Sequence, residues 1–164
     1  MQAVRRERLV VCDSQANGSG VMRSAFSRLP LVWEAALEMM QNEGLEAIFA
    51  RHARHRSAAQ AGMKAIGLPL FAAEGHGSPA ITAVAPNGID AEQLRKAVKE
   101  RFDILLAGGQ DHLKGKVFRI GHLGYVCDRD VLTAVSAIEA TLQSLGLNSG
   151  SMGAGVAAAA AALS

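Results

Sequence analysis

The segment at residues 108–124 constrains the fold of this chain more than any other part of the sequence. It holds a short apolar run at residues 117–120 that contains one arginine and has glycines on both sides. Because side chains of a β-strand alternate between two faces, Phe118 and Ile120 are predicted to point one way and Arg119 the other. Helices can bury the first face, while the second holds a guanidinium beside open space. Such a guanidinium suits a carboxylate, which it can bind through two parallel hydrogen bonds.

The composition is that of an ordinary globular protein. The chain has 164 residues, of which 49% are apolar and 20% are charged, enough for one domain with its own core. Its net charge of +2 gives no reason to expect nucleic acid or an anionic membrane as a partner. Cys12 and Cys127 form neither a CxxC motif nor a Cys/His ligand spacing, which argues against a disulfide scaffold and a zinc site.

Targeting signals are not evident in the sequence. No apolar run approaches the roughly 20 residues needed to cross a bilayer. Residues 1–8 contain arginines, but the apolar segment of a secretory signal does not follow them. We therefore expect a cytoplasmic protein with no membrane partner.

The first 28 residues are predicted to be a poorly defined leader. Residues 9–11 can form a short strand, and residues 13–20 have the composition of a loop. A glycine-rich loop after a strand could cradle a phosphate, but the Gly-Lys-Ser/Thr sequence of a phosphate-binding loop does not follow here. A flexible leader is the simpler interpretation.

Long helices are predicted next. Helical spacing of apolar residues begins after Pro30, is interrupted at Gly44 and ends near Gly67. The two resulting apolar stripes contain Val32, Trp33, Ala36, Leu37 and Met40, and then Leu45, Ile48, Phe49, His52, Ala59, Met63 and Ile66.

Short strands and two further helices are predicted to complete the domain at residues 29–147. Strands are expected at residues 80–84, 104–106 and 117–120, the last two forming an antiparallel hairpin with a long loop. Asp90 can cap a helix between the first two strands, and Asp128 or Asp130 opens a final helix. The predicted fold class is α+β, with a small, mostly antiparallel sheet of about three to four strands covered on one face by helices. The other face has no obvious cover.

The tail at residues 148–164 is rich in glycine and alanine. Residues 157–162 are all alanine, a strong helix former that offers little area to bury. A frayed helix, or one docked on a partner, is the expectation.

The remaining candidates for chemistry are basic residues. Residues 51–56 form a basic cluster in which His52 and His55 can share a helix face and, in principle, bind a metal. The position of His52 on the apolar stripe favours a packed histidine, and the arginines fit a solvated face. His76, His112 and His122 can each act as an acid or base, but no partner is evident, so a surface or packing role is expected for them.

Several pieces of the chain resemble, in order, the C-terminal small domain of class V aminotransferases. These are fold-type I pyridoxal-phosphate enzymes of the alanine–glyoxylate and serine–glyoxylate group. The similarity extends to cyanobacterial members that carry the label soluble hydrogenase small subunit, although nothing here resembles a hydrogenase metal site. The matching pieces are residues 33–52 (connecting helices), 78–84 (first strand), 102–109, and the distinctive GKVFRIGHLG block at 115–124.

This resemblance implies roles for residues present and absent. In the family, the arginine of the Arg-Ile-Gly block binds the α-carboxylate of the amino-acid substrate, and Arg119 stands in that place. Pyridoxal phosphate is implied for the complete enzyme, as a Schiff base on a lysine of the large domain within a Ser-Gln-Lys type motif. No lysine here lies in such a motif, and residues 14–16 read Ser-Gln-Ala. We therefore expect no catalytic, cofactor-binding or metal-binding residue in this chain, and no covalent cofactor on it.

The expected function is the small-domain portion of such an aminotransferase, inactive alone because the cofactor lysine is missing. Amino-acid and 2-oxo-acid substrates are implied for the complete enzyme, with a large-domain chain or a second copy as partner. The alternative is a non-catalytic interaction module that pairs with another chain through the uncovered sheet face and loose termini. RNA binding through the small sheet is a weaker idea, because only 4% of the residues are aromatic.

Overall fold

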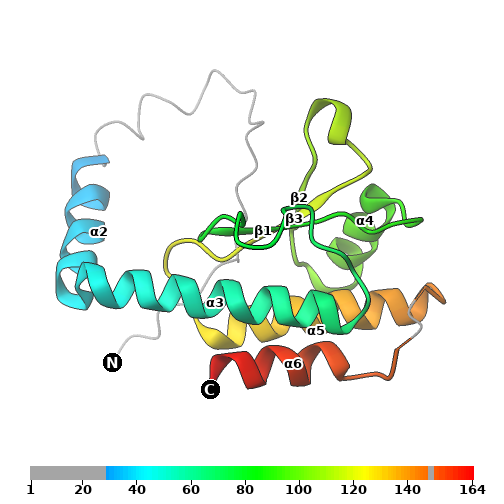
Figure 1. The fold of residues 1–164 in the computed structure, drawn as a ribbon. Helices are drawn as coiled ribbons and strands as arrows, with labels where there is room; N and C mark the ends of the chain where they lie inside the picture. The colour runs from blue at the N-terminus through cyan, green and yellow to red at the C-terminus, as the bar shows by residue number, and fades with distance from the viewer. Residues whose placement is uncertain (1–28, 148–149) are drawn as a thin grey trace.

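The structure, a computed structural model, describes residues 29–147 and 150–164 (Figure 1). The predictions for the leader at residues 1–28, including its short strand and its glycine-containing loop, lie outside the described residues, as do positions 148 and 149 of the tail. The elements are, in order, α2 (Leu29–Glu43), α3 (Leu45–Ala65), β1 (Ile81–Val84), α4 (Ala91–Phe102), β2 (Ala107–Gly108), the 3₁₀ turn η1 (Asp111–Leu113), β3 (Phe118–Gly121), α5 (Asp128–Ser144) and α6 (Ala154–Leu163). The predicted α+β class is confirmed.

The sheet has three strands, all antiparallel, in the order β1-β3-β2. The strand that carries Arg119 is therefore the central one, hydrogen-bonded on both sides. The predicted hairpin between the second and third strands is confirmed, since Ala107 pairs with Arg119.

The second strand lies further along the chain than predicted. Residues 104–106 were expected to form it, but β2 comprises Ala107 and Gly108. Ile104 and Leu106 are buried core side chains, which explains the apolar run. The carbonyl of Leu106 accepts a hydrogen bond from the Arg95 side chain instead of pairing with a strand. Burial alone therefore did not distinguish this segment from a strand.

The core lies between the sheet and a layer formed by α3, α5 and α6, which run side by side below the strands (Figure 1). Large side chains that are fully enclosed include Met63 of α3, Phe118 of β3 and Ile138 and Leu142 of α5. Asp90 caps α4 through hydrogen bonds from the backbone N–H groups of Glu92 and Gln93, as the sequence predicted.

Helix α2 stands away from this core. Gly44, at φ 83°, turns the chain between α2 and α3. The apolar stripe predicted on residues 32–40 is exposed: Trp33 and Val32 are each 64% accessible and Leu37 is 51% accessible. Spacing of apolar residues thus indicated the helix, but it did not indicate what covers it.

The alanine-rich tail forms a helix that packs on its own domain. Helix α6 contacts α3 and α5, so the expectation of a frayed or partner-docked helix is corrected. Gly155 makes this contact possible, because a Cβ there would lie 2.7 Å from Ile66 Cγ2 and 3.2 Å from Val135 Cγ1. The backbone N–H of Gly155 also donates to the buried carboxylate of Glu139, at 3.2 Å. The close approach that small residues allow, together with the hydrogen bond to Glu139, stabilises the docking of a helix that buries little apolar area.

Gly155→Leu is expected to destabilise the domain by about 1–3 kcal/mol, because the larger side chain forces α6 away from α3. Ala157→Leu is the matched control, since Ala157 is exposed on the same helix. The free energy of unfolding, measured by urea denaturation, should change by less than about 0.5 kcal/mol in the control. Equal stability of both variants would contradict close packing of α6.

Candidate functional site

Arg119 lies on the face of β3 that points away from the core. Phe118 and Ile120 are buried, whereas Arg119 is half-buried, so the predicted alternation is confirmed for these residues. Val117, which would share the face of Arg119 if the strand began there, is instead buried; it precedes β3, and its N–H donates to the carbonyl of Leu113 in the preceding turn. The strand pattern therefore begins one residue later than the apolar run.

The guanidinium of Arg119 is held by one contact to the backbone. Its Nε donates to the carbonyl oxygen of Gly108, at 3.0 Å. Within residues 29–147 and 150–164, no carboxylate forms an ion pair with Arg119 and its two Nη groups have no hydrogen-bond partner. Its cross-strand neighbours are Ala83 and Ala107, whose methyl groups leave room around it. The arrangement presents two N–H donors of a fixed cation beside small side chains.

The two glycines that precede the hairpin turn are required by close contacts. A Cβ on Gly108 would lie 2.6 Å from Arg95 Nη1 and 2.8 Å from Glu92 Oε1. A Cβ on Gly109 would lie 2.1 Å from the carbonyl oxygen of Leu113 in the η1 turn. The Gly-Gly pair thus lets α4 and the turn approach β2 closely.

The basic cluster on α3 holds the loop that follows β3. Arg51 forms a bidentate ion pair with Glu43, at 2.6 and 2.9 Å, and donates to the carbonyls of Gly124 (2.8 Å) and Val126 (3.2 Å). The side-chain hydrogen bond that Arg51 donates to Glu43 lowers the pKa of that carboxyl group. The expectation that the arginines form a solvated face is therefore wrong for Arg51, because unpaired loop carbonyls needed a donor.

Two histidines of this cluster are engaged in packing. His52 Nε2 accepts from the N–H of Gly124 at 3.2 Å, which assigns the ring proton to Nδ1 and its bond to the carbonyl of Ile48 at 2.7 Å. His55 is buried, with Nε2 2.8 Å from Asp128 Oδ1. Hydrogen bonds from Arg54 and then His55 lower the pKa of Asp128. No group of three or more His, Cys, Asp or Glu able to hold a metal is found in the part of the chain that the structure describes.

His122 is buried beneath the sheet, 1% accessible, with Nε2 3.0 Å from Thr82 Oγ1. Burial, and then the positive charges of His55, His52 and Arg56, lower its pKa from 6.5 to about 4. His76 and His112 are exposed. His122 therefore packs in the interior, whereas His76 and His112 lie on the surface, which are the two roles expected for these histidines.

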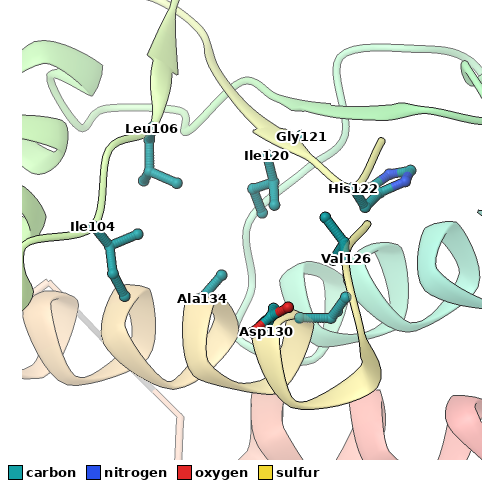
Figure 2. A pocket seen from close by; sticks show the side chains of 9 residues that line it. Ile104, Leu106, Ile120, Gly121, His122, Val126, Asp130 and Ala134 are labelled. Carbon is teal, nitrogen blue, oxygen red and sulfur yellow. The ribbon is translucent and has the colours of Figure 1, made fainter. Parts of the chain in front are cut away.

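A small cavity of about 10 Å³ lies between β3 and α5, on the core side of the strand (Figure 2). Ile104, Leu106 and Ile120 line it, with His122 and Asp130 at one end. This volume admits about one water molecule. Since Arg119 lies on the opposite face of β3, the cavity does not belong to its site.

The lysines do not form a site for pyridoxal phosphate. All five, at positions 64, 96, 99, 114 and 116, are exposed. Lys64 lies 3.8 Å from Glu74 and Lys96 lies 3.9 Å from Glu100. A lysine that forms a Schiff base is commonly activated by desolvation, which these exposed positions do not supply. The described residues therefore do not fit a covalently bound cofactor.

Its sequence and fold place the domain among known aminotransferases. It matches the pyridoxamine–pyruvate aminotransferase of Mesorhizobium loti with a TM-score of 0.73 and 35% identity, over 79% of this chain and 33% of that chain. Among curated proteins, it is 40% identical to the (S)-ureidoglycine–glyoxylate transaminase of Bacillus subtilis over 65% of this chain and 26% of that protein. No protein-family model matches the chain.

The homologues are class V aminotransferases, and the predicted resemblance is confirmed. A soluble hydrogenase small subunit of Synechococcus sp. (strain PCC 6716) is 64% identical over 131 residues, which are 80% of this chain and 34% of that protein. The chain thus spans about a third of the length of this relative. None of the described helices has the length and apolar character needed to span a membrane.

The buried His122 makes stability depend on pH. Because its pKa is about 4 in the folded chain and near 6.5 when unfolded, the unfolded chain binds the proton first as the pH falls. The free energy of unfolding should fall by about 2 kcal/mol between pH 7 and pH 5 through this residue. His122→Asn should remove that part of the decline in urea titrations at each pH.

His112→Asn, at an exposed position, is the control and should leave the pH dependence unchanged. Glu43 and Asp128, whose pKa values are lowered, lose their contribution at more acidic pH, so the window from pH 7 to 5 excludes these two carboxylates. The same pH dependence in wild type and His122→Asn would refute this assignment.

Proposed function

We propose that this chain is the small-domain portion of a pyridoxal-phosphate-dependent class V aminotransferase and that Arg119 binds the α-carboxylate of its amino-acid substrate. The observation that carries this proposal is the half-buried guanidinium on the open face of β3, without a carboxylate partner among the described residues. By their names, these relatives pair an amino donor (ureidoglycine, pyridoxamine or serine) with a 2-oxo acid (glyoxylate or pyruvate). Small substrates such as alanine or serine and glyoxylate are the proposed pair.

The local geometry supports a carboxylate rather than another anion. The bond from Nε to the carbonyl of Gly108 fixes the plane of the guanidinium and leaves the Nη donors for a ligand. Two parallel N–H groups match the two oxygens of a carboxylate, and such charge-assisted bonds contribute about 1.5–3 kcal/mol. Fixing the carboxylate orients the rest of the substrate.

The cofactor is proposed to lie outside the residues of this chain. The five exposed lysines do not fit a Schiff base, and the curated relatives extend well beyond the matched region. We therefore assign pyridoxal phosphate to a large domain that completes the site, in the same polypeptide or in a partner. Alone, the chain is expected to form no borohydride-stable adduct on a lysine.

Helices α2 and α3 expose several large apolar side chains. Trp33, Met40, Leu45 and Phe49 are between 43% and 64% accessible, which is unusual for large apolar side chains grouped on adjoining helices. A large-domain chain or a second copy of this chain is the proposed occupant. The same surface supports the alternative function, a non-catalytic module that pairs with another chain.

Arg119→Ala, in the enzyme assembled with its cofactor-binding domain, should weaken amino-acid binding roughly 10- to 100-fold through lost charge-assisted hydrogen bonds. Binding of pyridoxal phosphate should change by less than about twofold, because the role proposed for Arg119 is to bind the substrate carboxylate and the cofactor is assigned to the large domain. Substrate KM and cofactor absorbance titrations measure the two effects. Arg129→Ala is the control, since that side chain is 67% accessible. Equal loss of both affinities would mean that Arg119 is structural.

Trp33, the only tryptophan, reports directly on the apolar surface. If a second copy covers it, its fluorescence should shift to shorter wavelength as the chain concentration rises, and sedimentation should show a dimer. Phe49→Ser should favour the monomer, whereas Phe71→Ser, at a side chain 51% accessible outside these helices, should not. A monomer at every concentration would leave the large domain as the proposed occupant.

A further inference from the structure

Strand β2, which holds the acceptor for Arg119, is a short edge strand. It has two residues and pairs with β3 alone, through Ala107 and Gly108. One additional backbone bond, from Gly109 N–H to the carbonyl of Val117 at 2.8 Å, continues the pairing. Yet the carbonyl of Gly108 is the group that fixes the guanidinium of Arg119. An element that anchors the start of β2 therefore helps to set the position of this carbonyl.

Helix α4 supplies that support through one side chain. Arg95 Nε donates to the carbonyl of Leu106, the residue just before β2, at 2.6 Å. Arg95 Nη1 donates to both carboxylate oxygens of Glu92, each at 2.8 Å. Since the side chain of Arg95 is only 27% accessible, solvent competes weakly with these bonds. The Arg95–Glu92 pair thus ties the start of β2 to α4.

Gly108 lies between the two arginines. On its α-carbon side, a Cβ would overlap Arg95 Nη1 and Glu92 Oε1, at 2.6 and 2.8 Å. Its carbonyl oxygen accepts from Arg119 Nε at 3.0 Å. A displacement of the Arg95–Glu92 pair therefore moves the acceptor that orients Arg119.

We propose that Arg95, held by Glu92, is a positioning residue for Arg119 and sets the direction in which the free Nη groups point. The effect of Arg95 on substrate binding rests on the carboxylate-binding role proposed for Arg119. The contacts between α4, β2 and β3 stand without that role, so the two ideas can be tested apart.

The experiment follows the Nε–Hε proton of Arg119 by ¹H–¹⁵N NMR of the full chain, with Arg119→Lys assigning the signal by its loss. In Arg95→Met, exchange of this proton with water should accelerate about three- to tenfold, because the acceptor is no longer held. Arg95→Lys, which keeps a donor for the carbonyl of Leu106, should restore part of the protection.

Lys96→Met is the matched control, because Lys96 lies on the exposed side of the same helix, paired with Glu100 at 3.9 Å. It should leave the exchange of the Arg119 proton unchanged. Unchanged exchange in a folded Arg95→Met chain would overturn the proposal. If that variant does not fold, Glu92→Gln gives the same comparison, and wild-type exchange there overturns it equally.

Titration with alanine then distinguishes the two ideas. A shift of the Arg119 signal in wild type that weakens in Arg95→Met supports positioning and carboxylate binding together. The other outcome is that Arg95→Met accelerates exchange of the Arg119 proton but alanine shifts no Arg119 signal in the enzyme assembled with its cofactor-binding domain. That outcome supports the positioning role of Arg95 and removes the substrate role of Arg119.

Discussion

The central place of β3 in the sheet is the constraint on which the rest of this structure depends. Hydrogen bonds to β1 and β2 hold its backbone on both sides, and burial of Phe118 and Ile120 fixes which face meets the helices. A slip by one residue would move both side chains into solvent, at a cost of about 1.5–3 kcal/mol each. Arg119 is therefore held outward by the burial of its neighbours.

The chain after β3 is positioned from α3 in a similar way. Arg51 and His52 bind the backbone at Gly124, and His55 binds Asp128 at the start of α5. Arg51 and Arg54 of this cluster pair with Glu43 and Asp128, and Arg51 also donates to two loop carbonyls. Both segments that flank the Arg119 strand are thus fixed by side chains from helices: the one before it by α4 and the one after it by α3.

Much of this architecture could be predicted because its signals are local. Alternation around Arg119, the cap at Asp90 and the helical spacing on α3 and α5 each depend on neighbouring residues. The exact place of β2 could not be predicted, since Ile104 and Leu106 are buried without pairing as a strand. The Arg51 donors for the carbonyls of Gly124 and Val126, and the bond from Arg95 to the carbonyl of Leu106, join different elements, for which no local pattern exists.

The sequence by itself determined the α+β class and the outward direction of Arg119, because side-chain periodicity fixes which faces can be buried. Only the tertiary structure decided that Arg119 has alanines on both neighbouring strands, that Gly108 fixes its Nε, and that α6 packs on its own domain. These contacts join residues of different helices and strands. Their geometry follows from how whole elements pack, which residue spacing does not encode.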